Sequence, residues 1–477
     1  MSRVTANITT LSEEQIQQVH QSSLEVLSAT GIRVDSKRAR KVFSNAIGSS
    51  IQDEIVRIPA EIVNQAIKSA PSLIDIYTRA GNKLFSLGGD QKQGTIFGIG
   101  VTNSWYQDPM TDEVTPFSRT HVELAAKLGN TLSEYDVIST PGVIQTSLGE
   151  LGEVTATLEM MANTQKALTL LVSDPRQFTL SLDLLEFLHG DLSEKPFILP
   201  YVNPITPLVL NKDTSNKMFA TIERGLPFIF SSYGMSGATA PIMAASTLVL
   251  LNAELLAGLV FAQLIKAGTP VVLGILPSVF EMKNMISAYT TQTMLLNLAC
   301  ADMMNHYQVP HAGTSGSGTG WGADILGSGT AWMNHLTSTL GKVGLAPFVG
   351  GNFDSQAFSP AAVIYSNEVI RQARQFANGF ELDDASMGLD EIHTMGPGGN
   401  FLVSPQTLDH YRAVHEQHSH IWPSFSLNQW KSEGMPKASE VFRNFTLDQM
   451  QQIQAPKDHN ELIERGENFI RKQTNQY

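Results

Sequence analysis

The pattern of apolar and polar positions changes near residue 117. Before that point, short helical stripes are mixed with short segments of alternating polarity. A capping box at Ser12 and Gln15 predicts one helix, and a second helix is expected from Pro59 to about Ser69. Turn sequences at 79–82 and 109–112, each flanked by short apolar segments, predict two β-hairpins. These features predict an N-terminal α+β cap over residues 1–115.

Beyond residue 117, short continuous apolar runs are separated by segments long enough for a helix. Runs without alternation are typical of strands buried on both faces of a parallel sheet. The predicted strands are 137–143, 167–172, 197–202, 227–230, 271–276, the neighbours of Val309 and 346–349, with an eighth expected at 392–395. Eight βα units close into a barrel. We therefore expect an α/β protein with a (β/α)8 TIM barrel over residues 116–405 and a C-terminal helical extension over residues 406–477.

The main alternative to a barrel is an open, doubly wound sheet, which is built from the same βα units. Such a sheet normally carries a glycine-rich phosphate-binding turn after its first strand. The chain has no G-x-G-x-x-G at an early strand-to-helix junction and no G-x-x-x-x-G-K-[ST] anywhere. The pattern therefore favours the barrel.

The composition narrows the class of ligand and the compartment. The net charge of −13, from 32 basic and 45 acidic residues, argues against a nucleic-acid partner, because a phosphate-binding surface needs an excess of Lys and Arg. The single cysteine, Cys300, allows neither a disulfide framework nor a thiolate metal cluster, and it fits a reducing compartment. The N-terminus lacks the apolar core of a signal peptide, and no apolar stretch of about 18 residues is free of polar groups. We expect a cytoplasmic protein without a membrane span.

The segments that follow the predicted strands would meet at one rim of the barrel, where barrel enzymes place their active sites. They contain glycines, hydroxyls, amides and aromatic residues with few charges, and residues 313–322 are the most glycine-rich of them. A metal-dependent hydrolase would show several carboxylates and histidines here. Aromatic side chains on a neutral rim suit a quaternary ammonium, and glycines allow a planar cofactor carried by another protein to approach. A glycine-rich loop without a ligand is the alternative.

Seven segments, taken in order, point to a known family. They are residues 94–97, 106–113, 163–166, 237–241, 252–258, 268–271 and 396–402. In this order and spacing they make the chain resemble the trimethylamine methyltransferase family of corrinoid-dependent methyltransferases, from about residue 10 to 445. The resemblance implies a barrel that passes a methyl group from a methylated amine to the Co(I) corrinoid (cobalamin) of a separate, small corrinoid protein. It implies no tightly bound cofactor and no metal ligands in the chain itself.

Relatives that act on trimethylamine carry pyrrolysine in the region matching residues 314–324, and this chain has none there. A tertiary amine is a poor methyl donor without such an electrophile, whereas a quaternary amine is already activated because it leaves as a neutral tertiary amine. The resemblance therefore implies a quaternary amine as substrate, with glycine betaine first and proline betaine or carnitine as alternatives. The alternatives of another class are a non-catalytic betaine-binding protein and a metal-dependent lyase or hydrolase.

The expected site residues fall into three groups, and none is given a proton-transfer role. Aromatic residues expected to hold the ammonium are Phe97, Trp321, Phe348, Phe353, Tyr106 and Tyr233. Polar residues expected to hold a betaine carboxylate are His311, Asn352 and His393. Glycines expected to face the corrinoid are Gly316, Gly318, Gly320, Gly398 and Gly399. The sequence is compatible with a homodimer but does not require one.

Overall fold

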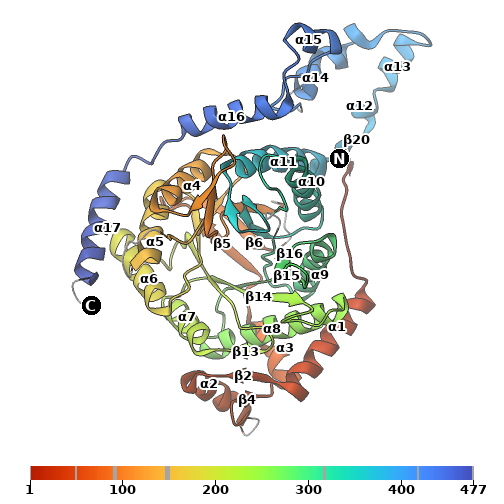
Figure 1. The fold of residues 1–477 in the computed structure, drawn as a ribbon. Coiled ribbons are helices and arrows are strands. Elements are labelled where there is room, and N and C mark those ends of the chain that lie inside the picture. The colour runs from red at the N-terminus through yellow and green to blue at the C-terminus, as the bar shows by residue number, and fades with distance from the viewer. Residues whose placement is uncertain are drawn as a thin grey trace.

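The computed structural model describes residues 2–48, 51–89, 94–145, 151–314, 318–415 and 418–474. Its centre is a closed barrel (Figure 1). Parallel strands neighbour one another in the order β7 (Ile96–Ile99), β10 (Val137–Ser139), β11 (Ala167–Leu170), β12 (Ile198–Val202), β14 (Phe228–Ser236) and β15 (Val271–Glu281), and β17 (Leu345–Val349) pairs with the other edge of β7. Residues 311 and 312 form parallel bridges to Leu273 in β15 and Leu345 in β17, which completes the ring. The predicted (β/α)8 barrel is confirmed.

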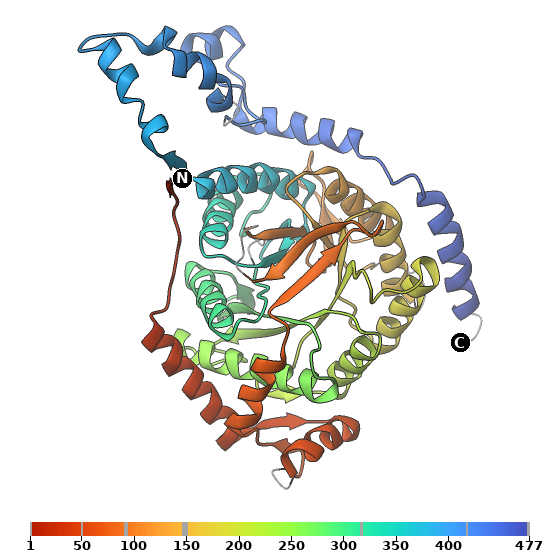
Figure 2. The ribbon, with the colours of Figure 1, turned by 180° about the vertical axis from the view of Figure 1, so that it is seen from behind.

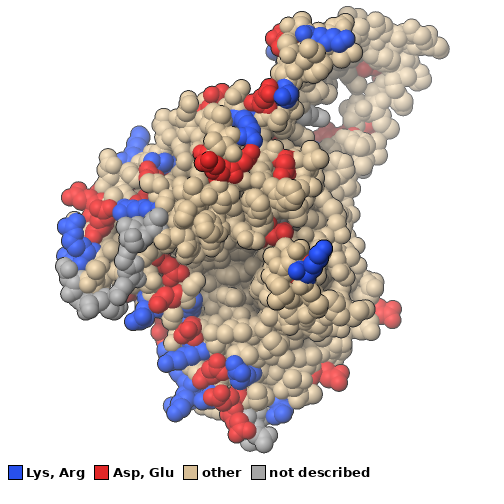
Figure 3. Space-filling model, viewed as in Figure 1, with Lys and Arg blue, Asp and Glu red and all other residues tan. Residues whose placement is uncertain are grey.

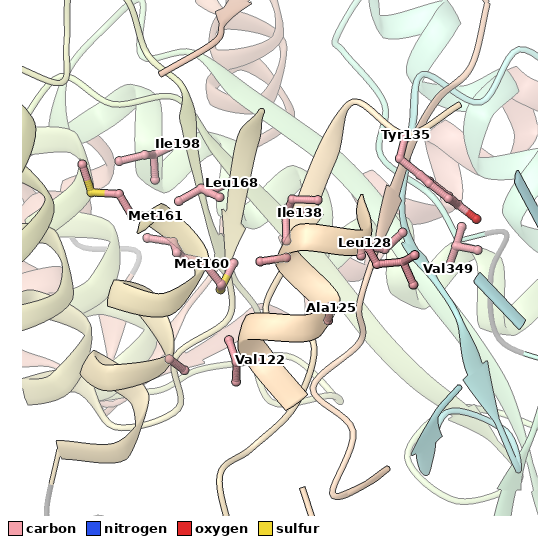
Figure 4. Packing of buried hydrophobic residues seen from close by; sticks show 14 of the residues in the cluster. Val122, Ala125, Leu128, Tyr135, Ile138, Met160, Met161, Leu168, Ile198 and Val349 are labelled. Carbon is pink, nitrogen blue, oxygen red and sulfur yellow. The ribbon is translucent and has the colours of Figure 1, made fainter. Parts of the chain in front are cut away.

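One helix follows each strand position and covers the outside of the barrel (Figure 1). These helices are α4 (Arg119–Thr131), α5 (Gly152–Asn163), α6 (Pro175–His189), α7 (Lys212–Glu223), α8 (Ala244–Ile265), α9 (Thr291–Tyr307), α10 (Ile325–Leu340) and α11 (Pro360–Asn378). Side chains at helical spacing form the contacts: Figure 4 shows Val122, Ala125 and Leu128 of α4 beside Ile138 of β10. The apolar runs were correctly predicted as strands because both of their faces are buried.

The eighth strand was predicted in the wrong place. Residues 392–395 belong to α13 (Leu389–Met395), which has no buried residue. The missing strand is β7, in which all four residues are buried, and it lies within the segment expected to be a cap. The barrel therefore begins before residue 116. β7 is hard to recognise because it is only four residues long and contains Gly98, which weakens its apolar pattern.

A β-hairpin closes the N-terminal end of the barrel. Its strands are β5 (Leu73–Tyr77) and β6 (Lys83–Gly88), as the turn at 79–82 predicted. The Tyr77 N–H donates to the Pro196 carbonyl, just before β12, and the Arg79 N–H donates to the Gln165 carbonyl, just before β11. Apolar side chains of the hairpin join the cluster of inward-facing barrel residues. Figure 2 shows the hairpin crossing this end.

The other N-terminal elements pack on the outside of the barrel against α8. They are α1 (Glu13–Glu25), η1 (Val26–Thr30), α2 (Lys37–Ile47), α3 (Ala60–Ser69) and a small sheet of β2 (Ile32–Val34), β3 (Ile51–Gln52), β4 (Ile55–Val56) and β13 (Val209–Leu210). The predicted capping box at Ser12 and the helix after Pro59 are confirmed. Among the described residues, α8 alone is long and apolar enough to cross a membrane, and 78% of its apolar window is buried inside the protein. α8 is therefore a core helix of this fold.

The C-terminal segment projects from the barrel and then returns to it (Figures 1 and 2). β20 (Phe380–Leu382) pairs with β1 (Ser2–Val4), and the projecting arm continues through α12 (Asp384–Met387), α13, η4 (Phe401–Val403), α14 (Pro405–His415) and α15 (Leu427–Ser432). α16 (Ala438–Gln452) and α17 (His459–Thr474) run back along the barrel, where α17 packs against α5 and α6. Arg79 and Asp458 form a two-pronged ion pair at 2.5 and 2.9 Å, which ties this segment to the closing hairpin.

Candidate functional site

Two small sheets extend the C-terminal end of the barrel, which we call the mouth. β14 and β15 continue beyond the barrel, and β16 (Ile286–Ala288) pairs antiparallel with the end of β15. A second sheet contains β9 (Val114–Pro116), β8 (Trp105–Gln107), β19 (Ala357–Phe358) and β18 (Gly351–Asn352). The mouth is hollowed at its centre, and residues without charge form most of the border in this view (Figure 3).

Four aromatic side chains meet at the mouth, and we call Tyr201, Tyr233, Tyr289 and Phe348 the mouth cluster. Tyr201 and Phe348 belong to the inward-facing residues of the barrel, with ring centroids 5.4 Å apart at an angle of 75°. The Tyr233 hydroxyl lies 2.8 Å from the Ser287 hydroxyl, within hydrogen-bond distance. Tyr289 lies close to both other tyrosines, because, after burial, proximity to Tyr289 raises the pKa of Tyr201 and proximity to Tyr233 raises the pKa of Tyr289. The cluster thus joins β12, β14, β17 and the segment before α9.

Hydroxyl groups hold the mouth cluster, and burial keeps the Tyr201 and Tyr289 phenols neutral. Ser278 donates to the Tyr233 hydroxyl at 3.2 Å, and the Ser355 hydroxyl hydrogen-bonds Tyr289. Burial raises the pKa of Tyr289 and of Tyr201 well above the usual range for tyrosine. The cluster therefore presents ring faces and hydroxyls rather than charges. Within the described part of the chain, no three His, Cys, Asp or Glu side chains form a group that could hold a metal ion.

The turn after β17 reaches the mouth in a strained conformation. Phe353, Asp354 and Ser355 have φ angles of 51°, 50° and 76°. This left-handed region costs an L-residue roughly 1–2 kcal/mol. The glycine-rich loop holds the turn in place, because the Phe353 N–H donates to the Gly320 carbonyl at 3.0 Å and the Asp354 N–H donates to the Gly318 carbonyl at 3.1 Å. Strain of this kind is concentrated at functional sites.

The amide of Asn352, expected to bind a carboxylate, is used inside the protein. It donates to the Gln107 Oε1 at 2.8 Å, and Gln107 in turn donates to the Trp321 carbonyl at 2.6 Å. This chain of amides fixes the glycine-rich loop to β8 and β18. The Trp321 side chain itself is 67% exposed, so its ring contributes no enclosed wall to the mouth.

Three of the six expected aromatic residues lie at the mouth, Trp321 is exposed on the glycine-rich loop, and the other two lie elsewhere. Phe348 and Tyr233 are in the mouth cluster, and Phe353 is half-buried on the strained turn. Phe97 faces outward from β7, with its ring 5.6 Å from His335, and Tyr106 stacks on His121 at 3.9 Å.

The two misplaced aromatics share one physical cause. Side chains of a strand alternate between its faces, so a residue at a strand end faces either the barrel interior or the helices. Phe97 belongs to the cluster between strands and helices, and Tyr106 belongs to the same cluster beneath β8. Burial raises the pKa of Tyr106 to about 12. Neither ring is available to a ligand at the mouth.

His311 also points away from the mouth. Its neighbour Ala312 belongs to the inward-facing cluster, so His311 faces the helices. The side chain is 1% exposed, and neither ring nitrogen has a hydrogen-bond partner among the described residues. Burial lowers the pKa of His311 to about 3. A neutral, enclosed imidazole cannot bind a substrate carboxylate at the mouth.

The remaining expected residues lie on the projecting arm or outside the described residues. His393 is exposed on α13, and Gly398 and Gly399 follow that helix in the arm, away from the mouth of the same chain (Figure 1). Gly318 and Gly320 border the mouth through the contacts given above. Gly316 lies outside the described residues.

Glu254, a buried acid in α8, has a structural role. Its carboxylate accepts hydrogen bonds from the Ser232 and Thr206 hydroxyls and from the Leu208 N–H. Burial raises the pKa of Glu254, and these hydrogen bonds oppose that rise. The acid fixes the loop after β12 from the helix side of the barrel, so it does not act as a base at the mouth.

A cavity of about 260 Å³ lies beside the mouth, between the glycine-rich loop, β18, α10, α11 and the returning C-terminal segment, and Gly318 and Asn352 line part of it. Three aromatic rings line it, those of Tyr365, Trp422 and Phe442, and their centroids are 5.9 to 6.2 Å apart. Rings at this separation are in contact with one another. We assign them to packing of the C-terminal segment against the barrel.

Sequence reasoning missed Tyr201, Tyr289 and Asp354. Tyr201 lies inside a predicted apolar strand, and Tyr289 lies shortly before α9 and far from the end of a predicted strand, so the pattern along the chain indicates neither as a rim residue. The alternation of β12, in which Leu199 and Tyr201 share the inward face, was the available signal for Tyr201. For Asp354, the signal was its position in the segment directly after a predicted strand.

The sequence of the chain matches one family of known proteins. The family model described as trimethylamine methyltransferase (MTTB) matches residues 1–477. The chain is 26% identical to a trimethylamine methyltransferase of Desulfitobacterium hafniense over 447 residues, covering 91% of this chain and 89% of that protein. It is 25% identical to a glycine betaine methyltransferase of the same species over 410 residues, covering 84% of each.

A solved structure agrees on the fold. The monomethylamine methyltransferase of Methanosarcina barkeri covers 95% of this chain and 96% of its own length, with a TM-score of 0.51 and 11% identity. This likeness concerns the fold alone. Because the family model spans the whole chain and both curated relatives are named as methyltransferases, this protein belongs to the trimethylamine methyltransferase family and is a methyltransferase.

Proposed function

We propose that this protein transfers a methyl group from a quaternary amine to the Co(I) corrinoid of a separate, small corrinoid protein. The observation that carries the proposal is the mouth cluster, whose aromatic rings lie at the barrel mouth and whose hydrogen-bond partners among the described residues are serine hydroxyls rather than Lys, Arg or His. The diffuse charge of an N-methyl ammonium is held well by ring faces.

The proposed reaction asks little of the chain beyond positioning. The N–CH3 bond breaks as the methyl group passes to cobalt, the electron pair stays on nitrogen, and a neutral tertiary amine leaves. The corrinoid, when its carrier is bound, supplies the nucleophile. The role of the chain is to hold one N-methyl group toward the opening and to exclude water. No proton moves, which agrees with the raised pKa of Tyr201 and of Tyr289.

Two features of the chain bear on which quaternary amine is the substrate. One relative is named for glycine betaine, and residues 314–324 of this chain lack the pyrrolysine found in relatives that act on trimethylamine. The residues expected to bind a betaine carboxylate do not meet at the mouth, as the positions of His311, Asn352 and His393 show. The mouth thus supports the ammonium half of a betaine more clearly than its carboxylate half.

The rim of the mouth carries an exposed apolar surface suited to a protein partner. Ile242, Met243, Met282 and Met285 are 61%, 68%, 66% and 71% exposed, around the start of α8 and the β15–β16 turn. Flexible methionine side chains are common at protein-binding surfaces. We infer that the corrinoid protein docks here, with Gly318 and Gly320 facing the corrinoid. A reducing cytoplasmic compartment suits both Co(I) and the single thiol.

The test combines the purified protein, the reduced corrinoid protein and a panel of amines. Glycine betaine, proline betaine, carnitine, choline and trimethylamine are supplied separately, and methyl-Co(III) formation is followed by absorbance. Methylation by at least one quaternary amine, and none by trimethylamine, is the expected result. Binding of a quaternary amine without any methyl transfer would favour the non-catalytic binding protein instead.

A matched pair of variants locates the site. Tyr233→Leu removes a ring of the mouth cluster, and we expect its KM for the best substrate to rise about tenfold through loss of a cation–π contact. Tyr106→Leu removes a similar ring that stacks on His121 outside the mouth, and its KM is expected to stay unchanged. Equal effects of the two variants would contradict the placement of the site.

A further inference from the structure

Asp354 is the one carboxylate that contacts the mouth cluster in the described residues. Its Oδ1 accepts the Tyr289 N–H at 3.4 Å, and its charge acts on the Tyr289 phenol. The side chain is half-buried, burial raises the pKa of its carboxyl, and the Tyr289 N–H opposes that rise. No Lys, Arg or His in the described part of the chain forms an ion pair with it, so the ionised carboxylate is an uncompensated negative charge next to the mouth cluster.

The backbone around Asp354 holds this charge in place at a cost. Residues 353–355 all have positive φ, and the turn is fixed from both sides. The Gly318 carbonyl accepts the Asp354 N–H at 3.1 Å, and the Asn103 side chain donates to the Ser355 carbonyl at 2.7 Å. Three strained residues in succession persist only where surrounding contacts enforce them. The position of the carboxylate is therefore built into the turn.

A fixed negative charge beside an ammonium site acts on the whole ligand. It attracts the quaternary nitrogen, but it also repels a carboxylate carried by the same small molecule. Among the described residues, the side chains hydrogen-bonded to the mouth cluster are serines, so none of them carries a positive charge that would offset that repulsion. A betaine, with no net charge, would gain less from this site than a quaternary amine whose other substituents are uncharged.

We propose that the mouth selects quaternary amines with a net positive charge over zwitterionic betaines, and that Asp354 is the residue that sets this preference. The inference rests on the proposed function and narrows it to choline-like or tetraalkylammonium substrates. Asp354 takes no proton and forms no bond to the methyl group. It acts as a specificity residue through its charge.

The sharpest probe compares glycine betaine with its primary amide. The two molecules have nearly the same shape, but the amide carries a net positive charge. Binding of each to the full-length protein is measured by calorimetry, and kcat/KM is measured with the reduced corrinoid protein. We expect the amide to be preferred over betaine on the order of tenfold in both measurements.

Asp354→Asn keeps the shape of the side chain and removes the charge. Asparagine tolerates positive φ, so the turn is expected to stay intact. The amide-to-betaine preference should fall to near unity in this variant. Glu113→Gln removes a charge from an exposed position on the neighbouring hairpin turn and should leave the preference unchanged.

The outcomes separate the two proposals. If betaine is preferred by the unaltered protein, or if Asp354→Asn leaves the preference unchanged, the charge selection is wrong while the methyl transfer stands. If both ligands bind with the expected preference but no methyl transfer occurs, the proposed function fails and the charge selection stands. If neither ligand binds, the charge selection is overturned, and the amine panel decides the proposed function.

Discussion

Two buried histidines should make the fold sensitive to mild acid. His311 and His335 are 1% and 0% exposed, and burial lowers the pKa of each from 6.5 to about 3. As the pH falls below 6.5, these histidines become protonated in the unfolded chain but stay neutral in the folded protein. The free energy of unfolding that they contribute above pH 6.5 is therefore lost progressively toward pH 3. With 1.36 kcal/mol per pH unit, each histidine costs about 2 kcal/mol between pH 7 and pH 5.

The assay compares unfolding free energies at pH 7 and pH 5. Urea unfolding is followed by tryptophan fluorescence and by far-ultraviolet circular dichroism, so that populated intermediates are detected. His311→Leu and His335→Leu should each reduce the loss between the two pH values by about 2 kcal/mol. His393→Asn, at an exposed position on α13, should not change it. A loss that is the same in all three variants would refute the assignment of buried neutral imidazoles.

Three further predictions concern packing, the C-terminal segment and the thiol. Gly258→Ala should destabilise the protein by about 1–3 kcal/mol, because the new Cβ would lie 2.2 Å from a phenylalanine ring of β14. Gly329→Ala, in an open part of α10, should stabilise the protein by up to about 1 kcal/mol. The urea concentration at the midpoint of unfolding tests both predictions. Arg79→Met removes the ion pair to Asp458 and should cost about 2 kcal/mol and speed proteolysis before α17; an unchanged cleavage rate would contradict this. Cys300 is 1% exposed and burial raises its pKa to about 12, so it should react with a thiol reagent only after denaturation, and rapid native labelling would be inconsistent with its burial.

The barrel was predictable because its strands are buried on both faces. Runs such as 197–202 are apolar at successive positions, and this pattern can be recognised without knowing which residues pack against the strand. β7 fails the same test because Gly98 interrupts a run of only four residues. The apolar residues near 392 gave a false signal, since they lie on an exposed helix of the arm rather than in the barrel.

The site was less predictable than the fold because it depends on the direction of each side chain. Phe97 and Phe348 both lie in barrel strands, yet Phe348 faces the interior and Phe97 faces the helices. That difference follows from strand register, which a single sequence does not fix. The neutral, aromatic character of the rim could be read from composition. The particular tyrosines that form it could not.

The hairpin of β5 and β6 bears on the order in which the amine and the corrinoid protein bind. It closes one end of the barrel with apolar side chains, so in the described part of the chain the mouth is the end left for a small molecule to enter and leave. If the corrinoid protein docks on that same mouth, it covers this route of exchange. The amine must then enter before the carrier arrives, and the demethylated amine must wait until the carrier departs. Steady-state kinetics should therefore show a compulsory order of addition, with excess carrier slowing turnover when amine is scarce.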